Sequence, residues 1–203
     1  MKIGKTPNVS QLPVATCPKG VPCSQRCYAC KATRTYNTAL RKWFNNTCLW
    51  RSDPKEFEKQ VFVYIEKRRP KFFRWSVAGD IPDPEYFRMI LRTACRFPDT
   101  KFYVPTKYYD LFLTSKGDTI VTREDWGVPA NLTLLISRWG HYEKGKVDLL
   151  MTAFPVANVQ LKDDAAASDD HGLKVRKCPG KCDKCRICWG KIKVGECVEF
   201  KEH

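Results

Sequence analysis

The sequence lacks any apolar run that approaches the length needed to cross a bilayer, which argues against a membrane-spanning protein. No signal peptide precedes the first cysteines, so we expect a soluble protein of the cytoplasm. Acidic residues are also few, with 22 Asp and Glu against 36 Lys and Arg, and the formal net charge is +14. Such a charge on 203 residues favours a polyanionic partner, either DNA or RNA. Histidine is rarer still: the three residues are isolated, and no role is assigned to them.

Cysteine, by contrast, is abundant, with eleven residues. In a reducing compartment this number indicates metal binding and not disulfides. Eight of the eleven form two clusters near the ends of the chain: Cys17, Cys23, Cys27 and Cys30, then Cys178, Cys182, Cys185 and Cys188. Cys48 and Cys95 fall in expected helices, where a lone cysteine is typically a small buried apolar residue.

The most specific motif is Cys23-x3-Cys27-x2-Cys30, whose thiolates can converge on one iron–sulfur or zinc site. Three thiolates on a four-iron cluster leave one iron open to a small molecule, most often S-adenosylmethionine. Cys17 lies six residues before Cys23 and could be a fourth ligand. In that case the open iron, and the chemistry that depends on it, would be lost.

The motif has an aromatic residue, Tyr28, directly after its second cysteine, and it resembles the cluster loop of radical S-adenosylmethionine (radical SAM) enzymes. With its Thr16-Cys17-Pro18 entry and its Cys27-Tyr28-Ala29-x-Lys31 run, the chain also resembles a phage-encoded family labelled "gene product 88". This resemblance covers most of residues 10–190 in the order of elements. It implies a [4Fe-4S] cluster on the first cysteines, Tyr28 packed over S-adenosylmethionine, and, for a phage protein, the host cytoplasm.

Strand and helix patterns alternate along the chain. Strands are expected near 11–16, 72–78, 101–105, 132–137 and 156–161, with helices near 36–47, 54–65, 84–94 and 108–113. The first of these helices has an apolar stripe that can pack on a sheet. The alternation favours parallel βαβ units, too few for a complete barrel. The expected fold is therefore α/β, an open partial (β/α) barrel over residues 1–161, followed by a linker at 162–177 and a small cysteine-rich metal-binding segment at 178–203.

In such sheets the functional residues gather at the carboxyl ends of the strands. The candidates there are Gly79, Asp80, Thr106, Lys107, Ser137, Arg138 and Gln160. The resemblance implies that Gly79 admits the cofactor and that the Asp80 carboxylate accepts its amino group; a strand-ending turn is the alternative. Lys107 and Arg138 would meet a carboxylate or a phosphate, or would be solvated charges without a role. The catalytic candidates are Asp80 and Lys107, and the cofactor-binding candidates are Tyr28, Gly79, Asp80, Ser137 and Arg138.

The second cysteine cluster, Cys178-x3-Cys182-x2-Cys185-x2-Cys188, offers four thiolates within eleven residues. Four thiolates can close a four-iron cluster or hold one zinc ion. Zinc sites typically use two separated pairs, whereas this spacing is continuous and ferredoxin-like. It therefore favours a [4Fe-4S] cluster, with zinc as the alternative. The resemblance implies that this cluster would be an auxiliary one.

Two functional hypotheses follow. The first is a minimal radical SAM enzyme that uses an electron donor and acts on a substrate such as a nucleic-acid base or sugar. The second is a non-catalytic protein in which two closed metal sites, iron–sulfur or zinc, support a basic module that binds DNA or RNA. Basic and aromatic residues interleave at 67–75 and 101–109, a pattern that can hold a single strand. The alternative is that these aromatic residues belong to the core.

Overall fold

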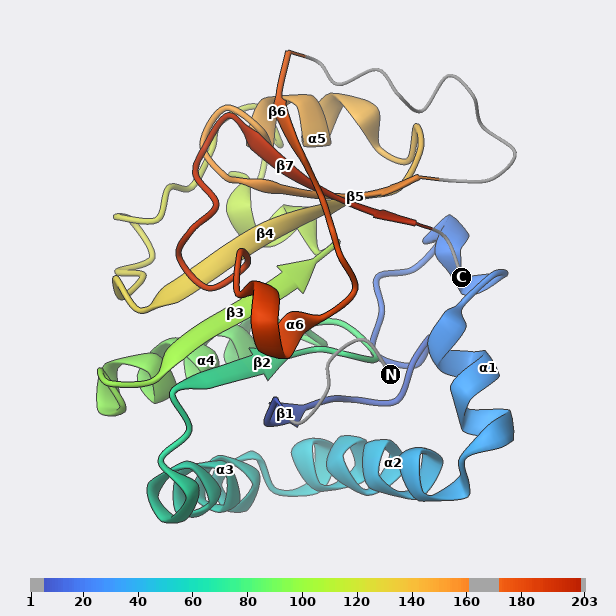
Figure 1. Ribbon diagram of the computed structural model, residues 1–203, viewed down its shortest axis with the longest axis vertical. Helices are drawn as coiled ribbons and strands as arrows, with labels where there is room; N and C mark the ends of the chain where they lie inside the picture. The colour runs from blue at the N-terminus through green and yellow to red at the C-terminus, as the bar shows by residue number, and fades with distance from the viewer. Residues whose placement is uncertain (1–5, 161–171, 202–203) are drawn as a thin grey trace.

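The computed structural model describes residues 6–160 and 172–201. Within them one sheet of seven parallel strands forms the centre of the molecule, with helices packed against it (Figure 1). From edge to edge the strands are β1 (Asn8–Val9), β2 (Phe72–Trp75), β3 (Lys101–Thr106), β4 (Leu132–Arg138), β5 (Val156–Gln160), β7 (Glu196–Lys201) and β6 (Lys174–Lys177). The α/β class and the parallel sheet are confirmed.

The helices expected near 36–47, 54–65 and 84–94 are present, the one expected near 108–113 is a 3-10 turn, and those at 28–35 and 144–150 were not expected. The helices are α1 (Tyr28–Thr35), α2 (Asn37–Ser52), α3 (Pro54–Arg68), α4 (Pro84–Arg96), α5 (Lys144–Leu150) and the short α6 (Cys182–Cys185), with 3-10 turns η1 (Pro22–Ser24) and η2 (Tyr109–Phe112). Two start at an aspartate and a proline. Asp53 accepts from the Glu56 N–H at 3.0 Å and Asp83 from the Tyr86 N–H at 2.8 Å, which satisfies otherwise unpaired donors of the first turn. None of the helices in the described part of the chain has the length and apolar character to span a membrane.

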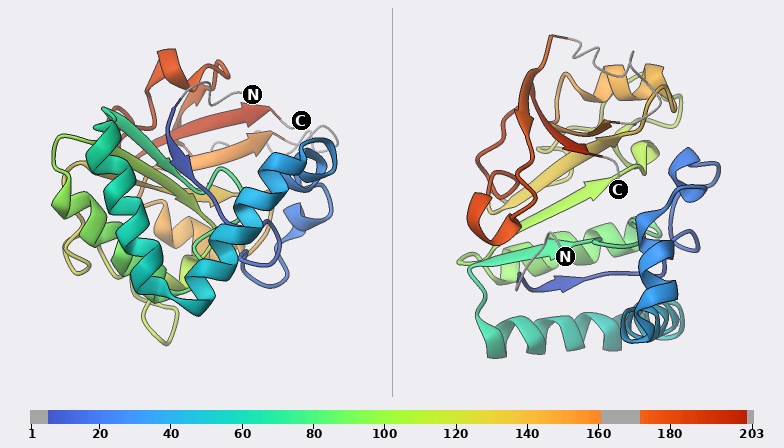
Figure 2. Two further views of the ribbon diagram at one scale, coloured as in Figure 1. Left: turned by 90° about the horizontal axis from the view of Figure 1, so that it is seen from below. Right: turned by 45° about the vertical axis from the view of Figure 1, so that its right-hand side comes forward.

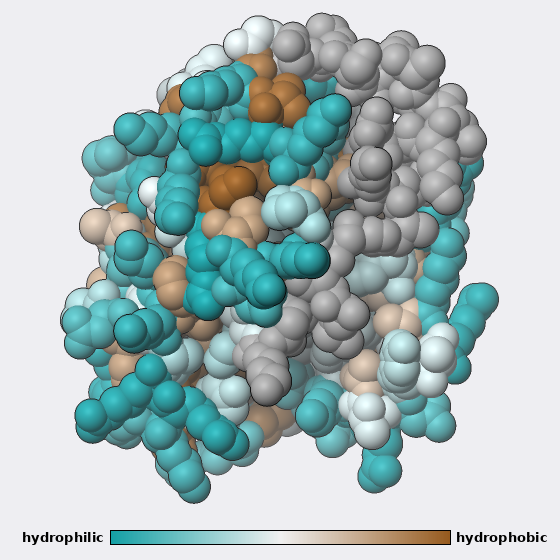
Figure 3. All heavy atoms as spheres, in the orientation of Figure 1, coloured by the Kyte–Doolittle hydropathy of each residue, from teal (hydrophilic) through white to brown (hydrophobic). Residues whose placement is uncertain are grey.

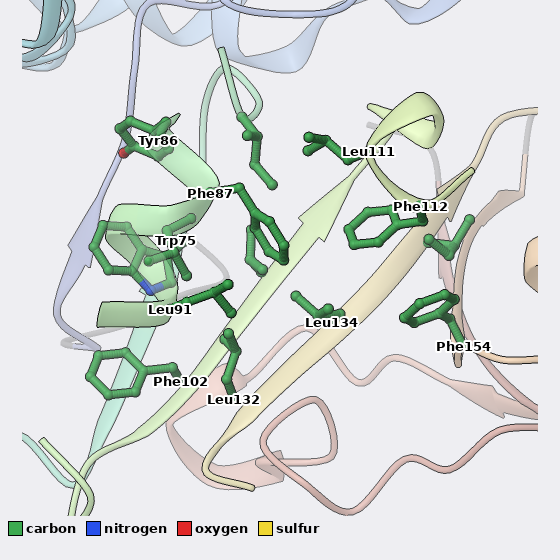
Figure 4. Close-up of a cluster of buried hydrophobic side chains, with 14 of the residues drawn as sticks. Trp75, Tyr86, Phe87, Leu91, Phe102, Leu111, Phe112, Leu132, Leu134 and Phe154 are labelled. Atoms are coloured by element: carbon green, nitrogen blue, oxygen red, sulfur yellow. The ribbon is translucent and has the colours of Figure 1, made fainter. Parts of the chain in front are cut away.

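The main core lies between the helices and one face of the sheet. Figure 4 shows Phe87 and Leu91 of α4 facing Trp75, Phe102 and Leu134 of neighbouring strands. All five are buried, so this face is sealed from water. Burial of large apolar side chains of this kind supplies most of the driving force for folding.

The second face of the sheet is covered by the cysteine-rich segment between β6 and β7. Its Trp189 and Ile192 pack against Tyr103, Leu135 and Val198. The Trp189 indole also donates to the Phe73 carbonyl at 2.8 Å. The chain advances from β1 to β5 but turns back from β6 to β7, and right-handed crossovers that run in opposite directions lie on opposite faces. The reversed strand order thus places the cysteines on this face.

Four local predictions differ from the structure. The first strand is Asn8–Val9 and not 11–16, because residues 13–16 form a turn. Most of the apolar stripe expected at 36–47 does not reach the sheet, since Tyr36, Leu40 and Phe44 are 57%, 39% and 52% exposed. Of the stripe, Thr47 is buried, and α2 packs through it together with Trp50. Cys48 and Cys95 lie on outward helix faces and are exposed. Residues 174–177 of the expected linker form β6, and residues 162–171 lie outside the described residues.

Trp189 provides a test of how far the cysteine-rich segment belongs to the fold. Trp189→Ala should lower the free energy of unfolding by about 3–5 kcal/mol, because it removes a buried ring and leaves the Phe73 carbonyl without its donor. Urea unfolding followed by circular dichroism measures this. The exposed control Phe44→Ala should change it by less than about 0.5 kcal/mol. An unchanged stability for Trp189→Ala would show that the segment is only tethered to the sheet.

Candidate metal centres

The first cysteine loop runs along the carboxyl edge of the sheet (Figure 2, right). After β1 the chain is joined to the end of β2: the Gln11 N–H donates to the Ala78 carbonyl at 3.1 Å, and the Val77 N–H donates to the Ser10 hydroxyl at 3.1 Å. These bonds fix the start of the loop before the first cysteine is reached. The loop is therefore held at the edge where parallel sheets generally bind ligands.

Gly79 is enclosed by this same N-terminal segment. Its φ is +69°, and a Cβ at this position would lie 2.4 Å from the Thr16 hydroxyl and 3.0 Å from the Gln11 carbonyl oxygen. Both the backbone conformation and the lack of space require glycine. The sequence hypothesis assigned the close approach to a cofactor; in the structure the chain's own residues before Cys17 make that approach.

The thiols of the first cluster lie within electrostatic reach of Cys27, and Cys17 is among them. Burial, together with the nearby charges of Asp80, Cys23 and Cys27, raises the pKa of Cys17 to about 12. Burial also raises the pKa of Cys23, while the positive charge of Lys107 opposes that rise. Cys30 is closer to the surface. Burial raises its pKa, and the charge of Cys27 and a hydrogen bond with Cys27 raise it as well. The structure thus groups Cys17, Cys23 and Cys27, with Cys30 attached through Cys27.

Asp80 joins the ends of two strands. Its carboxylate is 6% exposed and accepts from the Ile81 N–H at 2.7 Å, the Thr106 hydroxyl at 2.5 Å and the Lys107 N–H at 2.9 Å. Burial raises the pKa of Asp80, and these hydrogen bonds oppose the rise. Both oxygens are engaged within the protein, which matches the alternative reading of Gly79-Asp80 as a strand-ending turn.

Lys107 and Ser137 meet at the carboxyl edge, beside the first cysteine loop. The Lys107 ammonium donates to the Ser137 hydroxyl at 2.9 Å and lies 5.9 Å from the centre of the Trp139 ring. The Tyr109 hydroxyl donates to the Ser137 carbonyl at 2.7 Å, which holds the end of β4 in place. Lys107, which directly follows β3, and Ser137, in the neighbouring strand β4, therefore form one cluster, as predicted.

Arg138 does not join them. Consecutive residues of a strand face opposite sides of the sheet, so Arg138 lies on the face away from Ser137. Burial raises the pKa of Cys197 to about 11, and the charge of Arg138 opposes that rise; Cys197 belongs to the core on the helix side. Gln160 ends β5.

Tyr28 connects the first cysteine loop to β2. Its ring is 45% exposed, but its hydroxyl points inward and donates to the Val77 carbonyl. Burial of the hydroxyl raises the pKa of Tyr28, and the positive charge of Arg74 opposes that rise. The charges of three cysteines raise the pKa as well: Cys27, Cys17 and Cys182. The hydroxyl thus lies within electrostatic reach of both cysteine clusters.

The second cluster converges on the other face of the sheet. Cys178, Cys182, Cys185 and Cys188 line one cavity of about 10 Å³. Tyr103, Trp189, Val198 and Phe200 complete its largely apolar wall. Burial raises the pKa of Cys188 to about 12, and the charges of the other three cysteines raise it too. All four predicted ligands therefore share one site.

Arg74 is a component of this site that sequence reasoning missed. Within the described residues its Nε is buried without a hydrogen-bond partner, and its guanidinium lies 5.1 Å from the Tyr103 ring centre. Its positive charge opposes the rise that burial causes in the pKa of Cys182 and Cys188. The one available signal was a lone cation inside the aromatic run Phe72–Trp75.

The donor set of both clusters suits a thiophilic metal group. A buried cation without a carboxylate partner is costly, and neutral thiols do not offset it. Metal-bound thiolates carry negative charge, so Arg74 beside Cys182 and Cys188 fits such a group. In the arrangement described, residues 6–160 and 172–201 contain no set of three His, Cys, Asp or Glu side chains that could hold a metal ion.

Comparison with known proteins gives one match. Neither a curated protein nor a solved structure matches this chain. A family model described as Gene product 88 matches residues 2–191, which spans nearly all of the sequence. The likeness to radical SAM enzymes stays a prediction, whereas the likeness to this family is confirmed. The chain belongs to the gene product 88 family.

Proposed function

We propose that this protein is an iron–sulfur enzyme resembling the radical SAM proteins, built on an open partial barrel. The observation that carries the proposal is the position of the Cys23-x3-Cys27-x2-Cys30 loop. It lies on the carboxyl edge of a parallel sheet, where Lys107 and Ser137 also meet. When bound there, a [4Fe-4S] cluster with S-adenosylmethionine would supply reductive cleavage of the cofactor, using an electron from a separate donor.

The chain's own residues supply position and charge. Cys23, Cys27 and Cys30 would hold the cluster. Lys107, whose charge reaches Cys23, would balance negative charge and, with Ser137, donate hydrogen bonds to a carboxylate or phosphate. Asp80 fixes the backbone of Lys107 and in this way sets the direction of its side chain. A basic protein of this charge suits a nucleic-acid substrate.

A second candidate function rests on Cys17. Because it lies with Cys23 and Cys27, it could serve as a fourth ligand and close the first site. The protein would then be a non-catalytic iron–sulfur or zinc protein that binds DNA or RNA. The distinction between the two functions depends on whether one position of the metal group is free of protein ligands.

The second cluster would hold an auxiliary [4Fe-4S] cluster or one zinc ion. The cavity among its four cysteines is about 10 Å³, on the order of one water-sized sphere. Because no three of these thiols are placed to hold a metal ion in the described arrangement, either group requires the thiols to move, and a four-iron cluster requires the larger movement. The cavity favours zinc, and the continuous cysteine spacing favours the cluster.

The first prediction concerns Cys17. Under the enzyme proposal, Cys17→Ala retains the iron content of the wild type after anaerobic purification, whereas Cys27→Ala loses the iron of the first site. The electron paramagnetic resonance signal of the reduced wild type also changes when S-adenosylmethionine is added, because the cofactor binds an open iron. Loss of first-site iron in Cys17→Ala, together with a signal that ignores the cofactor, would instead establish the non-catalytic function.

The second prediction concerns Arg74. Arg74→Gln should weaken metal retention at the second site about 10- to 100-fold in a chelator challenge, the usual range for residues that support metal ligands. Arg74→Lys, which keeps the charge, should retain more metal. The exposed Arg41→Gln serves as the matched control.

A readout on the metal-free protein separates this electrostatic role from simple packing. Arg74→Gln should not destabilise the metal-free chain, because it removes a largely buried charge that no carboxylate balances within the described residues. Chemical unfolding after chelation measures this stability. Equal metal retention in the wild type and in Arg74→Gln would show that the charge of Arg74 does not support the site.

A further inference from the structure

We propose that a pocket at the amino edge of the sheet binds single-stranded nucleic acid. The inference deepens the nucleic-acid part of the proposed function and does not depend on catalysis. The pocket has a volume of about 450 Å³, within the range of ligand sites, and lies where α3 ends, β2 begins and α6 packs nearby. Its main lining residues are Tyr64, Arg68, Lys71, Phe72, Asp183 and Arg186. It is at the opposite end of β2 from the first cysteine loop.

The charge of the pocket suits phosphate. Arg68, Lys71 and Arg186 stand against a single acid, Asp183. Within the described ranges neither Arg68 nor Lys71 takes part in an ion pair, and the flanking Lys67 and Arg69 extend the basic run. Hydrophilic residues dominate the face that carries α6 (Figure 3). Unpaired cations at this density attract the phosphates of a strand.

The pocket also presents flat surfaces on which bases can stack. The Arg186 guanidinium lies 3.8 Å from the centre of the Phe72 ring, and its Nε donates to the Asp183 carbonyl at 2.8 Å, which fixes its plane. Tyr64 is 41% exposed, and its ring is braced by Phe73 at 6.5 Å. Aromatic rings and planar guanidinium groups are the stacking platforms of single-strand binding proteins.

The structure separates the two interpretations of the basic and aromatic run. Phe73 and Trp75 point into the core on the helix side, as the core interpretation expects. Phe72 has the opposite orientation and lines the pocket, together with cations from the loop before it. Unpaired bases can enter such a pocket, whereas bases in a duplex are already stacked and paired. A strand, with several phosphates, also matches the basic run at 67–71 better than a single nucleotide does.

Fluorescence anisotropy of labelled oligothymidylate and oligouridylate, titrated with the full chain over a range of salt concentrations, tests this proposal. Tyr64→Ala should weaken binding about tenfold by loss of one stacking surface. The double variant Arg68→Ala, Lys71→Ala should reduce the slope of log K against log salt by about 1.4, twice the ~0.7 of one single-strand phosphate contact. The control Lys144→Gln removes an exposed cation on α5. Its slope of log K against log salt should differ from that of the wild type by no more than the ~0.7 of one phosphate contact.

Each outcome decides a separate point. Weaker binding in the pocket variants but not in the control supports the pocket. Equal weakening in all variants, or in none, overturns it while leaving a nucleic-acid partner in place. A wild type that binds neither oligonucleotide, or binds with no salt dependence, overturns the nucleic-acid part of the proposed function as well. If a mononucleotide competes as well as the oligonucleotide does, the occupant is a free nucleotide and not a strand.

Discussion

The handedness of parallel crossovers is the constraint on which the rest of this structure depends. Strands β1 to β5 follow one another across the sheet, so their helical connections all lie on one face. A parallel sheet needs cover on both faces, and the second face would otherwise expose Tyr103, Leu135 and Val198. The return from β6 to β7 supplies that cover, because the reversed direction carries the connection to the opposite side. The cysteine-rich segment is thus a structural layer as well as a candidate metal site.

Fixed positive charges accompany both groups of thiols. Lys107 reaches Cys23 from the end of β3, and Arg74 reaches Cys182 and Cys188 from the middle of β2. The position of each cation is fixed by a strand of the sheet and not by a cysteine loop. The sheet therefore determines which positive charge lies near each group of thiols. Nearby negative charge would stabilise Arg74 more than Lys107, because the Arg74 Nε is buried and has no hydrogen-bond partner within the described residues.

The short helix α6 links the second cysteine group to the basic pocket. Cys182 and Cys185 point to the cavity of the cysteines, while Asp183 lines the basic pocket and Arg186 lines both. Arg186 lies over the Phe72 ring, and its Nε donates to the carbonyl of Asp183 between the two cysteines of α6. Under the proposals made above, metal binding and nucleic-acid binding share one wall, which is the physical basis for coupling between two sites.

Features that depend on neighbouring residues could be predicted from the amino-acid sequence. Strand and helix alternation gave the α/β class, Asp53 and Asp83 marked two helix starts, and the spacing within each cysteine run predicted that its thiols could converge. Features that depend on distant segments could be found only in the folded chain. It brought Cys17 to Cys23 and Cys27, filled the space beside Gly79 with Thr16, and turned Arg138 away from Ser137. It also enclosed Arg74 among the thiols of a segment more than one hundred residues later in the chain. Local patterns report propensity and periodicity, whereas strand order and the choice of face are set by long-range packing that no short stretch of sequence encodes.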